Sequence, residues 1–281
     1  MGKRDQLAQL ATETDRIVEI GGYVDPRSGV FVDLGESIQD AIRSTAVHDA
    51  PVEKPANATT DGDRSGTISV DNETTVAALL RLAGLPHDGT WCLLNFASPR
   101  NPGGGYQRGS DAQEESLARS SALAECLRSV PDFYAREYPA RPVGTGNLVH
   151  CGNVPFFRDA YGNLLEAPIA ASVITGVAVN QSAITQNDSL RRTISPKDIA
   201  GIMTGYVGNV LHLAAEKGES NLILGAWGTG VFGQSAEQVA RAFATMLIDR
   251  DCRSLFDRIH FAVPASASDD ATLLAFRKAL T

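Results

Sequence analysis

Apolar and polar positions along the chain follow two different periods, which alternate regularly after residue 66. Short apolar runs predict strands, several of them buried on both faces, whereas apolar residues three or four apart predict amphipathic helices. Strands are expected at 67–70, 90–97, 147–152, 154–159, 170–179, 221–227 and 258–264. Helices are expected at 74–84, 112–129 (interrupted by Pro131), 195–217, 235–249 and 269–280.

The N-terminal part of the chain has a less regular pattern. An amphipathic helix is expected at 3–18, a strand at 30–35 and a helix at 36–46. Residues 48–66 are rich in Pro, Asp, Gly and Ser, which predicts a mobile surface loop. We therefore expect a helical extension over 1–66, packed on a core over 67–281, with both parts in one structural domain.

Strands that alternate with helices predict an α/β fold with a mostly parallel sheet covered by helices on both faces. Ligands of such folds bind beyond the carboxyl ends of the strands. Two strands here run into glycine-rich loops, the strand at 90–97 and the strand at 221–227. We expect the two loops to meet in one crevice.

Composition limits the classes of ligand that this crevice could accept. Lys and Arg total 25 against 33 Asp and Glu, a net charge of −8, which argues against general nucleic-acid binding. An anionic ligand would need backbone N–H groups and helix N-termini instead. The four cysteines are scattered, so neither a disulfide framework nor a metal site is expected. No secretory signal or apolar membrane span is visible, and we expect a cytoplasmic protein.

The first glycine loop carries the clearest candidate chemistry. Gly103, Gly104 and Gly105 are followed, seven residues later, by Gln113, Glu114 and Glu115. Glycines allow a ligand to approach the backbone closely. The acids also fit two capping boxes, Asp111 with Glu114 and Ser110 with Gln113, so helix capping is a competing explanation. Consecutive helical residues point about 100° apart, so two catalytic acids here would need different roles.

The second loop has the form G-x-G-x-x-G, at Gly228, Thr229, Gly230, Val231, Phe232 and Gly233. Its late position and the lack of a suitable ribose-binding acid argue against a nicotinamide Rossmann fold. A phosphate-binding turn and a tight turn without a ligand are both possible. Phe232 could pack on a sugar. The five histidines form no pattern and are interpreted as structural or surface residues.

Together, the GGG and QEE motifs with their NFASPRNPGGG and SLARSSAL flanks resemble bacterial-type poly(ADP-ribose) glycohydrolases. The GAWGTGVFG stretch is similar to the second, diphosphate-binding loop of that family. The resemblance covers about residues 68–265 and implies a macrodomain fold, with a mixed, mostly parallel sheet between helices. It also implies hydrolysis of ribose–ribose bonds in poly(ADP-ribose), with no metal or cofactor and with a link to the DNA damage response.

The resemblance implies a role for each matching residue. Glu115 would be the catalytic acid/base, Glu114 would bind ribose hydroxyls, and Gln113 would help to position them. Gly103 to Gly105 would lie against the diphosphate and terminal ribose. Gly228, Thr229, Gly230, Val231 and Gly233 would wrap the diphosphate, and Phe232 would press on the terminal ribose. Asn101 is a further candidate for a ribose contact.

One loop departs from the family pattern, and several functions stay open. After the strand at 170–179 the family has a proline-containing loop, whereas residues 176–180 read GVAVN, which leaves adenine and ribose contacts there undefined. The alternatives are a hydrolase of another ADP-ribose conjugate, a non-catalytic ADP-ribose-binding module, a nicotinamide oxidoreductase and a structural protein. ADP-ribosylated proteins are the expected substrates, with cleavage from chain ends.

Overall fold

The computed structural model describes residues 2–55, 64–85 and 89–281. Helices are α1 (Lys3–Ile20), α2 (Gly35–Ser44), α3 (Thr75–Ala83), α4 (Gln113–Ser120), α5 (Leu123–Arg128), α6 (Pro131–Glu137), α7 (Gln181–Gln186), α8 (Asp188–Thr193), α9 (Pro196–Glu216), α10 (Ala236–Ala244) and α11 (Ala271–Leu280). Strands are β1 (Gly22–Val24), β2 (Phe31–Asp33), β3 (Ala46–His48), β4 (Thr67–Asp71), β5 (Trp91–Phe96), β6 (Leu148–Arg158), β7 (Leu164–Gly176), β8 (Asn221–Gly225) and β9 (Arg258–Ala262). Short turns of helix also cover Tyr106–Arg108 (η1), Thr245–Asp249 and Cys252–Leu255.

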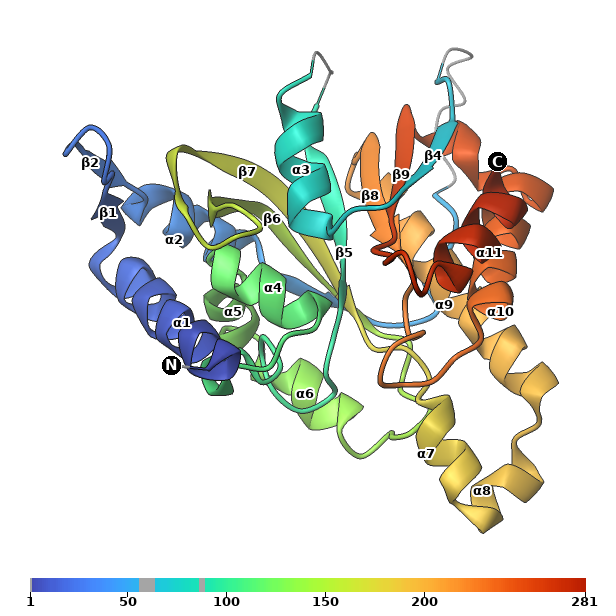
Figure 1. Ribbon diagram of the computed structural model, residues 1–281. Coiled ribbons are helices and arrows are strands. Elements are labelled where there is room, and N and C mark those ends of the chain that lie inside the picture. The colour runs from blue at the N-terminus through green and yellow to red at the C-terminus, as the bar shows by residue number, and fades with distance from the viewer. Residues whose placement is uncertain (1, 56–63, 86–88) are drawn as a thin grey trace.

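A seven-stranded sheet in the order β3-β6-β7-β5-β8-β9-β4 forms the centre of the molecule. The sheet has a parallel part made of β7, β5, β8, β9 and β4. The remaining two pairings, β3 with β6 and β6 with β7, are antiparallel. Asn221 pairs with Trp91 on one side and Arg258 on the other, so β5, β8 and β9 end at the same edge. The predicted mixed, mostly parallel sheet between helices is confirmed (Figure 1).

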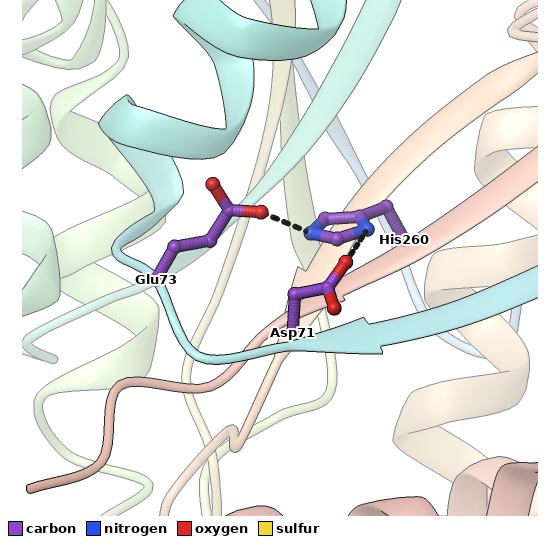
Figure 2. A group of neighbouring side chains, drawn as sticks. All are labelled: Asp71, Glu73 and His260. Atoms are coloured by element: carbon purple, nitrogen blue, oxygen red, sulfur yellow. Dashed lines mark ion pairs between the residues drawn. The ribbon is translucent and has the colours of Figure 1, made fainter.

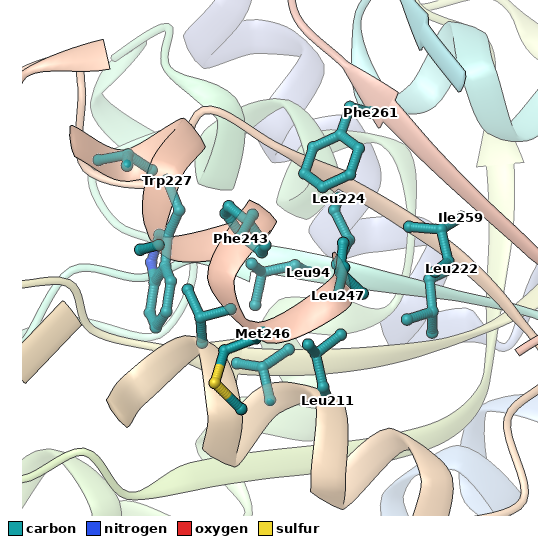
Figure 3. Packing of buried hydrophobic residues seen from close by; sticks show 14 of the residues in the cluster. Leu94, Leu211, Leu222, Leu224, Trp227, Phe243, Met246, Leu247, Ile259 and Phe261 are labelled. Atoms are coloured by element: carbon teal, nitrogen blue, oxygen red, sulfur yellow. The ribbon is translucent and has the colours of Figure 1, made fainter. Parts of the chain in front are cut away.

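The apolar strands are buried on both faces because each face has its own layer of helices. In β5, Cys92 and Leu94 belong to one core cluster and Trp91 and Leu93 to the other, as expected when successive side chains point to opposite faces. The first cluster lies under α9, α10 and α11 and includes Phe243, which Figure 3 shows among its neighbours. The second lies under α1 to α6.

The N-terminal segment packs on the core and also contributes to the main sheet. Its strand β3 pairs with the start of β6, with Ala46 opposite His150. Helix α2 lies beside β6, and Ser44 exchanges hydrogen bonds with the backbone of Gly152. A separate two-stranded sheet, β1 with β2, follows α1. The boundary at residue 66 stays a prediction. Residues 56–63 of the predicted 48–66 loop lie outside the described residues.

Several predicted elements differ from the structure. The helix expected at 112–129 breaks at Ser121, whose extended backbone bridges to Phe156, and α6 begins at Pro131. The strands expected at 147–152 and 154–159 form one strand, β6, with an irregularity after Cys151. β7 starts six residues before the predicted strand, and β1, β3, α7 and α8 were not predicted. These elements depend on partners that are distant in the sequence.

Candidate active site

The two glycine-rich loops leave the sheet at the same edge, which is the lower edge in Figure 1. One follows β5 and leads through η1 into α4, and the other follows β8 and leads into α10. Phe232, from the second loop, and Pro99, from the first, line one pocket of about 340 Å³ together with Val177, from the loop after β7. The two loops therefore share one pocket, although none of their predicted glycines and neither Glu114 nor Glu115 is among its lining residues.

The glycine run after β5 is folded tightly against the two acids. Gly103 and Gly104 have positive φ angles of 71° and 63°, which favour glycine. A Cβ on Gly104 would lie 2.5 Å from Oε1 of Glu115 and 2.9 Å from Oε2 of Glu114. A Cβ on Gly105 would lie 2.5 Å from Oγ of Ser110. The glycines therefore have a steric role within the protein, and Gly104 lies against both carboxylates.

Glu114 points into the interior and is only 3% exposed. Its Oε2 accepts a hydrogen bond of 2.7 Å from the amide of Ser98, whereas Oε1 has no hydrogen-bond partner in the described part of the chain. Burial, together with the neighbouring charge of Glu115, raises the pKa of Glu114 from 4.5 to about 8. Oε1 is therefore a buried acceptor that a hydroxyl group could use.

Glu115 lies partly exposed at the glycine loop. Its Oε1 accepts from the amide of Gly105 at 2.9 Å, and its Oε2 accepts from the amide of Ala112 at 3.1 Å. The contact with Ala112 is a capping interaction at the start of α4. The capping explanation is thus partly right but names the wrong acid, because Glu115 caps the helix and Glu114 does not. The two neighbouring acids have different environments, as the helical geometry predicted.

Gln113 is engaged with the protein itself. Its Oε1 accepts from the amide of Phe96 at 2.9 Å, and its Nε2 donates to the carbonyl of Leu94 at 2.8 Å and to Oγ1 of Thr75 at 3.2 Å. These bonds hold the start of α4 against the end of β5. Asn101 lies at the turn before the glycines, and its backbone carbonyl accepts a hydrogen bond from the amide of Gly104. It also lines a smaller pocket of about 220 Å³.

The second glycine loop presents backbone amides on an open turn. Gly228 and Gly233 have φ angles of 89° and 67°, and the Val231 side chain is 85% exposed. Among the described residues, no protein acceptor binds the amides of Gly230, Val231 or Phe232. Such a run of amides suits an anion. Thr229 caps the turn by donating from Oγ1 to the carbonyl of Ala226 at 2.9 Å.

Helix α1 holds the first glycine loop from outside, which the sequence pattern did not indicate. Asp15 accepts hydrogen bonds from the Tyr106 hydroxyl at 2.5 Å and from Gln107 at 2.7 Å. Arg4 donates to the carbonyl of Arg108 at 2.9 Å. Because Tyr106 directly follows Gly105, these contacts fix the backbone that binds Glu115.

The loop after β7, where the chain departs from the family pattern, nevertheless lies at the crevice. Val177, Ala178 and Asn180 line the 340 Å³ pocket, and Asn180 also caps α7 by accepting from the amide of Ala183. The unpredicted helices α7 and α8 contribute further wall residues, including Leu190.

One histidine belongs to a cluster that the sequence did not reveal. Asp71, Glu73 and His260 offer ligand atoms within 4.8 Å of one another (Figure 2). However, Glu73 approaches Nε2 of His260 at 3.0 Å, while Asp71 approaches the opposite nitrogen, Nδ1, at 3.9 Å. Arg81 forms ion pairs with both acids. Since one ion cannot bind both edges of the ring and Arg81 balances the carboxylates, the cluster is a structural ion network.

The buried carboxyl of Glu114 predicts a pH-dependent stability. Its pKa is higher in the folded protein than in the unfolded chain, so it binds a proton more tightly when folded. Its stabilising contribution is complete below about pH 4.5 and decreases as the pH rises through about 8. In urea titrations from pH 5 to pH 8.5, Glu114→Gln should lose less stability than the wild type. Equal losses in the two proteins would contradict the prediction, and the exposed Glu36→Gln is the control.

Comparison with known proteins connects this geometry to a family. A model of the catalytic domain of microbial-type PARG matches residues 11–159. A poly(ADP-ribose) glycohydrolase (PARG) structure from Thermomonospora curvata is 36% identical, with a TM-score of 0.89 over 99% of this chain and 100% of that one. The same enzyme bound to the inhibitor ADP-HPD is 36% identical, with a TM-score of 0.84 over 98% of this chain and 99% of that one. The Deinococcus radiodurans enzyme in complex with ADP-ribose is 31% identical, with a TM-score of 0.73 over 86% of this chain and 96% of that one. No curated protein matches.

Among the described residues, no helix has the length and hydropathy needed to cross a bilayer.

Proposed function

The chain belongs to the microbial-type poly(ADP-ribose) glycohydrolases, and we infer that it hydrolyses the ribose–ribose O-glycosidic bonds of poly(ADP-ribose) and releases ADP-ribose. The observation that carries this inference is that the carboxylates of Glu114 and Glu115 both lie against Gly104, at the edge of the sheet where ligands of parallel sheets bind. A binding module without catalysis would not require the second acid.

We propose different roles for the two acids. Glu115 is partly exposed at the glycine loop and acts as the acid/base. Glu114, through its unpartnered Oε1, accepts a ribose hydroxyl. Gln113 acts indirectly, because its amide is occupied by β5 and Thr75 and positions the helix that carries both acids.

The two glycine loops hold the rest of the terminal unit. Gly103, Gly104 and Gly105 approach the diphosphate and terminal ribose, with Asn101 beside them. The turn of Gly228, Thr229, Gly230, Val231 and Gly233 wraps the diphosphate, for which the open amides provide donors. Phe232, which lines the 340 Å³ pocket, presses on the terminal ribose. This arrangement suits a protein with a net charge of −8 because it needs no basic surface.

The proposed reaction uses one carboxyl group twice. Glu115 donates its proton to the leaving ribose oxygen as the bond to the anomeric carbon breaks, and an oxocarbenium-like centre develops. The diphosphate of the substrate helps to stabilise that positive charge. The Glu115 carboxylate then removes a proton from water, which attacks the anomeric carbon and restores the acid. The mechanism requires no cofactor or metal.

The finer features of the function follow from the same assignment. Cleavage proceeds from chain ends, an assignment that rests on the family resemblance. ADP-ribosylated proteins are the substrates, and the acidic surface disfavours general nucleic-acid binding. We place the protein in the cytoplasm and in the response to DNA damage, on the family resemblance.

Substrate comparison tests the function. The wild type should release ADP-ribose from poly(ADP-ribose) at least tenfold faster than from a mono-ADP-ribosylated protein, measured by chromatography at equal ADP-ribose content. Faster release from the mono-ADP-ribosylated protein would favour a hydrolase of another conjugate. Binding of ADP-ribose without release from either substrate would indicate a non-catalytic module.

A further inference from the structure

Two arginines at the edge of the crevice stack on one tyrosine. The guanidinium of Arg141 lies 3.4 Å from the centre of the Tyr138 ring, and that of Arg100 lies 4.8 Å from it. All three side chains are exposed, and Tyr138 is 41% accessible. We call Arg100, Tyr138 and Arg141 the arginine rim. Cation–π contact with the Tyr138 ring explains why the two guanidinium groups stack on it, but the two positive charges repel each other.

The charge of the arginine rim is not balanced by the protein. In the described part of the chain, neither Arg100 nor Arg141 has a carboxylate oxygen within 4.0 Å. The adjacent acid, Glu137, is buried and accepts hydrogen bonds from Thr145 instead. By contrast Arg136, on the same helix, is paired with Asp49. The rim is thus a local concentration of positive charge in an acidic protein, and it suits an anionic ligand.

The rim lies at the pocket that both glycine-rich loops help to line. Arg141 and Pro99, the neighbour of Arg100, both line the 340 Å³ pocket. Arg100 comes two residues after Ser98, whose amide binds Glu114. An anionic ligand that extends from the pocket would therefore meet the guanidinium of Arg141.

We propose that the arginine rim binds the diphosphate of the ADP-ribose unit next to the one being released. This inference rests on the proposed function. The diphosphate of the terminal unit is assigned to the two glycine loops, but each further unit of the polymer brings another diphosphate. Arginine binds phosphate oxygens through two parallel N–H groups. Binding at the rim lets the enzyme recognise the polymer chain as well as its terminal unit.

Binding measurements in the Glu115→Gln background test this subsite without turnover. Arg100→Ala should weaken the affinity for poly(ADP-ribose) chains about tenfold, and it should lower the dependence of that affinity on salt. The affinity for free ADP-ribose should change less than twofold. Tyr138→Leu, which keeps both charges but removes their support, should show a smaller loss of the same kind. Arg136→Ala is the control, because Arg136 is an exposed arginine of α6, two residues before Tyr138, that is already paired with Asp49. Its replacement should have no effect.

The outcomes separate this inference from the proposed function. Equal weakening for ADP-ribose and for the polymer would overturn the subsite, since the rim would then contact the terminal unit. Unchanged polymer affinity in Arg100→Ala and Tyr138→Leu would also overturn it. If the wild type releases no ADP-ribose while polymer binding still depends on Arg100, the glycohydrolase function fails and the anionic subsite is supported.

Discussion

Glu115→Gln should reduce release of ADP-ribose from poly(ADP-ribose) by on the order of 10²-fold or more, with the affinity for ADP-ribose little changed. Gln has nearly the same shape as Glu and keeps one acceptor oxygen for the amide of Gly105 or Ala112. It cannot donate the proton that the leaving ribose needs, nor activate water. The initial rate of ADP-ribose release and a titration with ADP-ribose measure the two quantities.

The control must separate lost chemistry from a weakened helix start. Glu36 also lies in the first turn of a helix, α2, and is exposed. Glu36→Gln removes the same favourable charge at a helix N-terminus, worth about 0.3–1 kcal/mol, and should leave the rate unchanged. Near-wild-type release by Glu115→Gln would remove Glu115 from the mechanism and leave it as a cap.

Sequence periodicity predicted the elements whose signals are local. The start of α9 is an example, since Ser195 and Asp198 form the expected capping box and Pro196 occupies the first turn. The central strands were equally clear, because β5 and β8 are mostly apolar, with one asparagine each. The break at Ser121 was not predictable, because it depends on a bridge to Phe156, 35 residues later.

The candidate site shows the same division. The GGG and QEE motifs indicated the loop and the acids, and the matching family model covers both motifs. The sequence could not show which acid is buried, because this depends on how α4 packs on β5. Nor could it show that Asp15, from the N-terminal helix, binds Tyr106 beside the glycines. Asp71, Glu73 and His260 come together through the pairing of β4 with β9.

Gly104→Ala should strongly reduce the release of ADP-ribose. Its Cβ would overlap Oε1 of Glu115, at 2.5 Å, and press on Oε2 of Glu114, at 2.9 Å. Both carboxylates would have to move, and displacement of a catalytic group by about 1 Å can cost on the order of 10²-fold in rate. The φ of 63° adds a cost of about 1–2 kcal/mol to stability. Release of ADP-ribose and thermal unfolding should therefore both be measured.

Gly218→Ala separates the two effects of that change. Gly218 has a similar φ of 75°, but a Cβ there would meet nothing within 4 Å. The two variants should therefore lose comparable stability from backbone strain, while only Gly104→Ala loses activity by orders of magnitude. If the two variants retained equal activity, the contact between Gly104 and the acids would have no catalytic consequence. If Gly104→Ala lost activity only through unfolding, its rate would recover at low temperature, where both variants are folded. Loss of rate in the folded Gly104→Ala protein would show that the glycine is needed for the space it leaves to the two carboxylates.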